Sequence, residues 1–170
     1  MVDGWVYFLS AVIAVQRVSE LILANRNKRL IKSIGGREYS PEHYPLFFLL
    51  HISWFLGWIY EGNVKNELSS IWYIWLCLLF FAQILRYWCM ASLGRYWNTR
   101  ILIVPGSQRV KMGPYRFIPH PNYLAVAIEL VSVPLIFNAY YTASVISLLN
   151  AILLIGIRIP AEEKALEQLK

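Results

Sequence analysis

SSIWYIWLCLLFFAQILRYWCM, residues 69–90, is the stretch of this chain that decides its fold class. Its only strongly polar members are Gln83 and Arg86, and both lie near its end. An α-helix needs roughly 20 consecutive apolar residues to cross the hydrocarbon core of a bilayer, and this stretch is long enough. The sequence therefore predicts a membrane-spanning helix at this point of the chain.

The rest of the chain repeats this pattern and has too few charges for a water-facing surface. Apolar residues make up 58% of the 170 residues and charged residues 15%, against roughly 25% charged in an ordinary soluble domain. We therefore expect an all-α fold, a polytopic membrane bundle of about five transmembrane helices in one domain over residues 1–170. N-terminal helices would occupy residues 1–90, and a loop, a helical hairpin and a tail would occupy residues 91–170. The other four apolar stretches are Trp5–Ala24, Tyr44–Tyr60, Tyr123–Phe137 and Tyr141–Ile157.

The basic residues of the loops predict the orientation of this bundle. Five lie between the first and second stretches and five between the third and fourth, whereas residues 61–68 contain only Lys65 and residues 138–140 contain none. Because cytoplasmic loops are enriched in Lys and Arg, we expect both basic loops and the C-terminal tail on the cytoplasmic side of the plasma (inner) membrane. This placement accounts for the net charge of +6 and argues against nucleic acid as a partner.

The cysteine and histidine residues do not predict a metal site. Cys77 and Cys89 lie inside one apolar run, where a reduced thiol behaves as a small hydrophobe. His43, His51 and His120 are scattered along the chain without metal-ligand spacing. We therefore expect no metal among the cofactors.

The segment from Ala91 to Asn122 does not fit a membrane helix, because proline lacks the N–H group that an interior helical turn requires. We expect Thr99–Val104, which is rich in β-branched residues, to be extended, and residues 104–107 to form a turn. A long loop with this aromatic and aliphatic content is more typical of a functional segment than of disorder. Its prolines are Pro105, Pro114, Pro119 and Pro121.

Two polar motifs lie at the same end of the predicted bundle. GPYRFIPHPNY, residues 113–123, ends the long loop, and RIPAEEKAL, residues 158–166, follows the last apolar stretch. A short hairpin formed by the last two apolar stretches would bring the two motifs together in space. Arg158 and Glu162 are four residues apart and would share one face of a helical tail.

The pairing of these motifs resembles the isoprenylcysteine carboxyl methyltransferase family of membrane enzymes, which use S-adenosylmethionine. The resemblance extends over most of the chain, since three further stretches are similar to those of the family's small bacterial members. They are RVSELILANRN (residues 17–27), EYSPEHYP (residues 38–45) and GRYWNTRILIVPGS (residues 94–107). The chain departs from the family pattern at Pro119, where many members have a basic residue, and Arg116 is a candidate substitute.

The resemblance implies a cytoplasmic cofactor-binding cap, built from residues 107–123 and 158–166, and a role for each matching residue. Arg158 matches an arginine that faces the methyl acceptor, which makes it the expected catalytic and substrate-binding residue. Glu129, on the fourth stretch near Tyr123, is a second candidate for the acceptor cavity. The expected S-adenosylmethionine contacts are Gln108, Arg109, Val110, Tyr115, His120, Pro121, Asn122, Tyr123 and Glu162.

The chemistry of these residues is compatible with methyl transfer. A carboxylate such as Glu162 accepts hydrogen bonds from a ribose or an ammonium group, aromatic rings attract a sulfonium cation, and Arg109 or Arg116 can meet a carboxylate. Arg158 is always protonated and can hold an acidic acceptor as its anion. We expect a lipophilic acceptor that enters from the bilayer, either a prenylated carboxylate or, slightly favoured, an acidic hydroxyl on an alkyl-chain metabolite such as an alkylpyrone.

The charges inside the apolar stretches and in the long loop are compatible with two other functions. Arg17 and Glu20 lie three residues apart in the first stretch, where an internal ion pair that fixes helix packing is the favoured interpretation. A non-catalytic transporter or lipid-binding protein would explain these charges but not the two motifs. A related membrane reductase that uses NADPH would need a phosphate-binding basic cluster, which the sequence does not distinguish from Arg109, Lys111 and Arg116.

Overall fold

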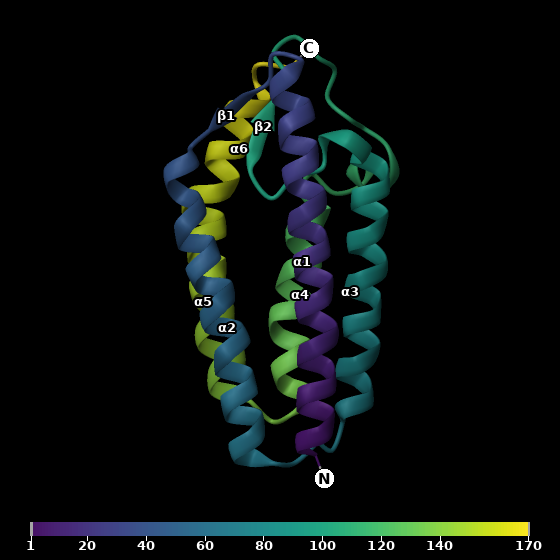
Figure 1. The fold of residues 1–170 in the computed structure, drawn as a ribbon, viewed down its shortest axis with the longest axis vertical. Coiled ribbons are helices and arrows are strands. Elements are labelled where there is room, and N and C mark those ends of the chain that lie inside the picture. Colours follow the sequence, from purple (N-terminus) through teal and green to yellow (C-terminus); the bar gives the residue numbers. More distant parts are fainter. Residues whose placement is uncertain (1, 170) are drawn as a thin grey trace.

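The computed structural model describes residues 2–169, and within them five long helices run side by side along the longest axis of the molecule (Figure 1). This arrangement confirms the all-α fold that the apolar stretches predict. The fourth and fifth helices form the expected hairpin, joined through residues 137–139. The helices are α1 (Asp3–Ser33), α2 (Tyr44–Lys65), α3 (Trp72–Leu93), α4 (Pro121–Ile136) and α5 (Tyr140–Leu153).

Within residues 2–169, three helical segments are long and apolar enough to cross a membrane, namely Asp3–Ser33, Trp72–Tyr96 and Tyr140–Leu166. The 22 residues of α2 extend over about 33 Å, which also matches the hydrocarbon thickness, and α4 is a shorter apolar helix of 16 residues. The helices α2 and α4 lie alongside these three segments (Figure 1). The expectation that they also cross the membrane rests on this position. The chain is an integral membrane protein.

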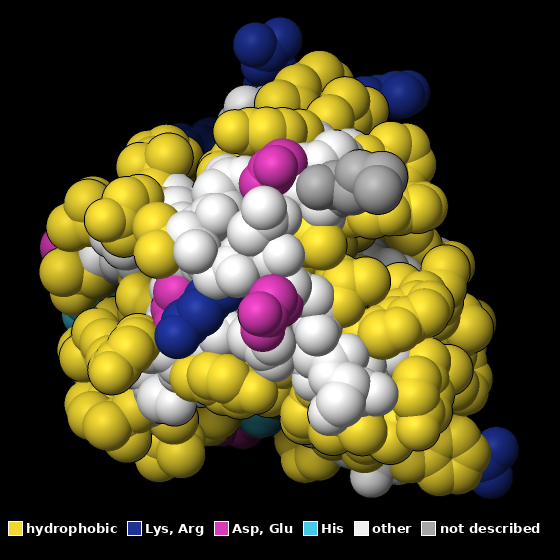
Figure 2. Space-filling model, turned by 90° about the horizontal axis from the view of Figure 1, so that it is seen from below, with side chains coloured by type: hydrophobic (Ala, Val, Ile, Leu, Met, Phe, Trp, Pro, Cys, Tyr) yellow, Lys and Arg dark blue, Asp and Glu magenta, His cyan; other side chains and the backbone are white. Residues whose placement is uncertain are grey.

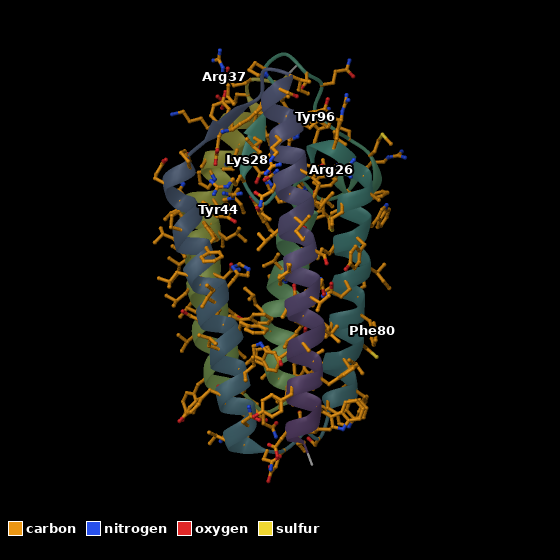
Figure 3. All side chains as sticks on the ribbon, in the orientation of Figure 1. Arg26, Lys28, Arg37, Tyr44, Phe80 and Tyr96 are labelled. Carbon is orange, nitrogen blue, oxygen red and sulfur yellow. The ribbon has the colours of Figure 1, made fainter. Side chains whose placement is uncertain are left out.

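The outer surface of the bundle is apolar, as contact with lipid requires. Viewed from the end that holds the N-terminus, hydrophobic side chains cover most of the periphery, and the few charged side chains of this end lie nearer its centre (Figure 2). Phe80 points away from α3 and is 60% exposed (Figure 3). In water such a surface would be an association site, whereas in a bilayer it is solvated by acyl chains.

A small cap closes the opposite end of the bundle, where the C-terminus lies (Figure 1). The antiparallel strands β1 (Arg37–Tyr39) and β2 (Ile101–Ile103) pair with Arg37 opposite Ile103, and α6 (Ile159–Leu166) packs on them. The extended geometry expected for Thr99–Val104 is confirmed for Ile101–Ile103, whereas residues 99 and 100 form a bend. The turn at residues 104–107 is confirmed, and there the Ser107 N–H donates to the Val104 carbonyl. The cap also includes 3-10 turns at Pro41–His43, Gly94–Tyr96 and Gly113–Arg116.

The first helix is longer than its apolar stretch predicts. It continues from Ala24 to Ser33, so most of the basic residues expected in a loop lie on a helix instead. The extension is stabilised by the cap, because the Asn27 side-chain amide donates to the Trp97 carbonyl over 2.8 Å and Ile31 is fully buried. A helix end that packs on protein can be polar. The end of the apolar stretch therefore does not mark the end of this helix.

Large aromatic side chains fill the core at the end away from the cap. The ring of Trp58 stacks on that of Phe137, with centroids 5.6 Å apart, and the Trp54 indole N–H donates to the Leu130 carbonyl. The Glu61 carboxylate accepts the backbone N–H groups of Tyr141 and Thr142 at the start of α5. These contacts join α2 to the hairpin of α4 and α5.

A cluster of four charged residues joins α1, α3 and α4 inside the bundle. Arg86 donates to both carboxylate oxygens of Glu20, at 2.7 and 2.8 Å, and to Glu129 at 3.0 Å. Arg17 pairs with Glu20 at 2.7 Å and with Glu129. The ion pair expected between Arg17 and Glu20 is therefore confirmed as part of a larger, charge-balanced group, which costs less at membrane depth than unpaired charges would.

Replacing Arg86 with glutamine leaves Glu20 and Glu129 with one cation between them. Loss of one partner from a buried ionic group costs about 3–5 kcal/mol, so we expect a clear fall in the thermal unfolding midpoint of the detergent-purified protein. The matched substitution Arg95→Gln changes an exposed side chain that bonds only its neighbour Tyr96, and should leave the midpoint unchanged. An equal midpoint for both variants would contradict a stabilising role for the cluster.

Candidate functional site

The chain changes its helical geometry at the point where it enters the cap. Residues Leu154–Arg158 form a π-helical turn between α5 and α6, and Pro160 is the second residue of α6. Proline has no N–H to donate to the carbonyl of Gly156, four residues earlier, so the regular α-helical pattern cannot continue there. Such π-turns are frequent at functional sites. This one leaves Arg158 only 7% exposed, directed toward α4 and the long loop.

The two polar motifs meet at the hydroxyl group of Tyr123. Tyr123 donates to the Glu162 carboxylate and accepts a bond of 3.1 Å from Nε of Arg158. Arg158 also donates from Nη2 to the Thr99 carbonyl at 2.9 Å. The sequence predicted that Arg158 and Glu162 share a face, and the structure adds that Tyr123 bridges them.

His120 lies just before α4 and links the same motifs a second time. Its Nε2 lies 2.7 Å from Oε1 of Glu163, and its ring stacks on that of Tyr123 with centroids 5.4 Å apart. Arg109 from the long loop reaches the same Glu163 oxygen at 3.4 Å. Glu163 is not among the predicted cofactor contacts, yet it holds His120 and Arg109 in place.

The GPYR turn is seated directly on α3. Gly113 has a φ of +56° and lies so close to Trp88 and Ser92 that a Cβ atom there would overlap the Ser92 hydroxyl. The close approach directs Tyr115 toward Cys89 and the motif residues. Burial, together with the nearby Cys89 thiol and Glu162 carboxylate, raises the pKa of the Tyr115 phenol, so it stays a neutral hydrogen-bond donor.

A cavity of about 180 Å³, the cap cavity, lies between the long loop, β2 and the tail. Of the residues predicted to contact the cofactor, all but Pro121 line it; Pro121 is buried in the first turn of α4. Arg158 lines it too, whereas Glu129 belongs to the charge cluster and Arg116 is exposed. The predicted residues in its wall are Gln108, Arg109, Val110, Tyr115, His120, Asn122, Tyr123 and Glu162.

Much of the remaining cap-cavity wall comes from residues 96–104, to which the sequence gave no role. The Trp97 indole N–H and the Asn122 side-chain carbonyl are buried without a hydrogen-bond partner among the described residues. Both residues lie in the wall and keep an unused hydrogen-bonding group there. The GRYWNTRILIVPGS stretch was noted only for its family resemblance, and spacing alone does not reveal that it folds over the tail.

A second cavity, the membrane cavity, adjoins the first and has a volume of about 390 Å³. It lies mainly between α1, α2 and the ends of α4 and α5, and aromatic and aliphatic side chains dominate its wall. Among them Val18 and Leu56 are 56% and 61% exposed on the outside of the bundle. Both cavities share six wall residues, namely Trp97, Asn98, Thr99, Asn122, Tyr123 and Arg158.

Together the fold and the paired cavities define an integral membrane protein with one cavity in its cap, lined partly by charged and polar side chains, and a more apolar cavity between its helices. Residues 75–168 match the model of the isoprenylcysteine carboxyl methyltransferase (ICMT) family. The chain belongs to this family, whose members are S-adenosylmethionine-dependent membrane methyltransferases, and the resemblance seen in its motifs is thereby confirmed.

Two relatives extend the similarity to nearly the whole chain. An uncharacterized protein of Bacillus subtilis (strain 168), YpbQ, is 42% identical over 163 residues, which cover 95% of this chain and 96% of the relative. An uncharacterized protein of Haemophilus influenzae is 28% identical over 161 residues, or 94% and 93% of the two chains. No solved structure matches the chain significantly.

The wall of the cap cavity is tied to α1 through Glu38 on β1. Arg100 donates to Glu38 at 2.5 Å, Lys28 lies 3.1 Å from it, and the Arg100 guanidinium stacks on Tyr44. Burial alone would raise the pKa of Glu38, but the hydrogen bonds from Arg100 and Lys28 outweigh it and lower the pKa below its ordinary value of 4.5.

The lowered pKa of Glu38 predicts how acid affects the cap. The ionised carboxylate stabilises the folded state fully above the ordinary pKa of 4.5, and this contribution is lost as the pH falls through the lower folded-state pKa. We expect Glu38→Gln to lower the thermal midpoint at pH 7 and to lower it progressively less below pH 4.5. A difference that is constant from pH 7 to pH 3 would contradict this account.

Proposed function

We propose that the protein transfers a methyl group from S-adenosylmethionine to a carboxylate or an acidic hydroxyl oxygen of a lipophilic acceptor at the cytoplasmic face of the membrane. The observation that supports this most is the shared wall of the two cavities. A water-soluble cofactor and a lipid-soluble acceptor need separate entrances and one common boundary, and the wall at Tyr123 and Arg158 is such a boundary.

The residues of the cap cavity fit S-adenosylmethionine group by group. Glu162 and the unpartnered Asn122 oxygen accept hydrogen bonds from hydroxyl or ammonium groups, and Arg109 meets a carboxylate. The rings of Tyr115 and Tyr123 offer faces to adenine or to a cationic sulfur. When bound, the cofactor supplies an electrophilic methyl group to an aligned oxygen nucleophile, and this chain's part is to bind and align the two reactants.

Arg158 is the residue best placed to hold the acceptor. Its Nε and Nη2 donate to Tyr123 and Thr99, no side-chain bond of the described residues uses Nη1, and the residue lines both cavities. A guanidinium stays charged at any physiological pH, so it favours the anionic form of a carboxylic acid or enol. An acceptor held in this form needs no separate strong base.

The membrane cavity favours an acceptor that arrives from the lipid. Exposed apolar residues of α1 and α2 form its outer edge, which is consistent with entry from the side. Arg26, Lys28 and Arg37 lie at the cap end of the bundle (Figure 3), and a basic cap favours the cytoplasmic side of the inner membrane. A small alkyl-chain metabolite with an acidic hydroxyl, such as an alkylpyrone, fits this cavity as well as a prenylated carboxylate does.

Calorimetric titration of the detergent-purified protein with S-adenosylhomocysteine tests the cofactor. We expect saturable binding that weakens at least tenfold in Glu162→Gln, because the carboxylate's charge-assisted bonds are lost while the hydrogen bond from Tyr123 is kept. Glu167→Gln, an exposed neighbour on the same tail, should bind as the wild type does. Binding of NADPH without S-adenosylhomocysteine would support a reductase instead, and binding of neither would remove the proposed activity.

Incubation of membranes with a radiolabelled methyl donor tests the transfer itself. Label should enter the lipid extract, and Arg158→Gln should reduce this transfer by about 100-fold or more while S-adenosylhomocysteine binding stays within a few-fold of wild type. Release of the label by mild base would identify an ester and resistance an ether. Full transfer by the Arg158→Gln protein would show that another residue holds the acceptor.

A further inference from the structure

The membrane cavity contains polar groups that methyl transfer at Arg158 does not use. Arg17, His51 and Arg86 from three different helices lie in its wall, together with Asn150 from α5. Polar side chains are expensive at membrane depth and usually serve a partner there. Arg17 and Arg86 also hold the charge cluster together, but His51 takes no part in that cluster, and a cavity for a plain hydrocarbon chain would not need it.

The hydrogen bonds of His51 fix which of its ring nitrogens is free. Its Nδ1 lies 2.7 Å from the Phe47 carbonyl oxygen, which can only accept, so Nδ1 bears the proton and donates. In the neutral ring Nε2 then keeps its lone pair, and no described residue bonds to it. His51 therefore presents a hydrogen-bond acceptor in the wall of the membrane cavity.

Arg17 supplies donors in the wall of the same cavity. Its side chain is 23% exposed, whereas those of its partners Glu20 and Glu129 are 5% and 1% exposed. The guanidinium has five N–H groups in all, more than these two carboxylates engage. Arg17 and His51 thus offer both a donor and an acceptor, the pair that a hydroxyl group needs.

The helices set the depth of this pair below the reacting end. The Phe47 ring lies 5.7 Å from the Arg158 guanidinium carbon, and His51 follows one helical turn later, a rise of about 6 Å. Glu129, which binds Arg17, follows Tyr123 by six residues on α4, a rise of about 9 Å. The polar pair therefore lies roughly 6–9 Å deeper than the boundary between the two cavities.

We propose that the membrane cavity recognises a second oxygen on the acceptor, a hydroxyl that donates to Nε2 of His51 and accepts from Arg17, roughly 6–9 Å from the oxygen held by Arg158. This inference rests on the proposed function and narrows its substrate class. The acceptor is a lipophilic molecule with two oxygen functions, one methylated and one bound deeper, and not a simple acyl or prenyl chain.

Binding of three probes to the purified wild-type protein in detergent micelles tests the proposal. Stearate, 7-hydroxystearate and 12-hydroxystearate are compared by displacement of radiolabelled stearate, with partition into protein-free micelles subtracted. When the carboxylate lies at Arg158, carbon 7 of an extended zigzag chain with C–C bonds of about 1.5 Å reaches the depth of His51. Carbon 12 lies beyond that depth. We expect 7-hydroxystearate to bind about tenfold tighter than stearate and 12-hydroxystearate no tighter.

Two histidine variants separate recognition from packing. His51→Phe should reduce the preference for 7-hydroxystearate to about one while stearate keeps its affinity, and His43→Phe, outside the membrane cavity, should retain the preference. No preference in the wild type, or a preference that survives in His51→Phe, overturns the proposal. S-adenosylhomocysteine titration of the same samples separates this proposal from the proposed methyl transfer. If S-adenosylhomocysteine binds but 7-hydroxystearate is not preferred, only the second-oxygen site is removed.

Discussion

The hydroxyl group of Tyr123 is the contact on which the site depends. It bonds Glu162 from the tail on one side and Arg158 on the other, so one side chain of α4 sets the position of both. Together with the neighbouring contact between His120 and Glu163, it fixes the tail against the proline-rich loop and so forms one wall of the cap cavity. The π-turn at residues 154–158 is the local distortion that turns Arg158 toward this hydroxyl.

The buried charges explain how a thin bundle keeps an open cavity beside its core. Arg86 and Arg17 join α1 and α3 to α4 through Glu20 and Glu129, while α2 is held to the hairpin by aromatic packing and by Glu61. The membrane cavity lies between these two groups of contacts. Strong ionic contacts on one side and aromatic contacts on the other hold its walls apart at a depth where lipid-soluble molecules reside.

Hydropathy predicted most of the fold, and the family resemblance predicted part of the cap-cavity wall. The five apolar stretches, the broken loop and the meeting of the two motifs follow from hydropathy, proline chemistry and the resemblance. The roles of Glu163, His51 and Trp97 could not be predicted in this way. Each depends on a partner 43 to 70 residues away in sequence or on a cavity that exists only once the helices have packed. Similarly, hydropathy placed the end of α1 at Ala24, since it does not register a polar helix that is stabilised by the cap.

Cross-linking across the two motifs tests the central claim, that the tail folds back beside the loop, most directly. His120 and Glu163 would be replaced by cysteine in a protein whose Cys77 and Cys89 are changed to alanine, and a short bifunctional thiol reagent would be added to intact membranes. We expect efficient intramolecular cross-linking of this pair, and none when the cysteine at position 163 is paired with Asn66→Cys at the opposite end of the bundle. Equal yields for both pairs, or no cross-link at 120 and 163, would contradict the account.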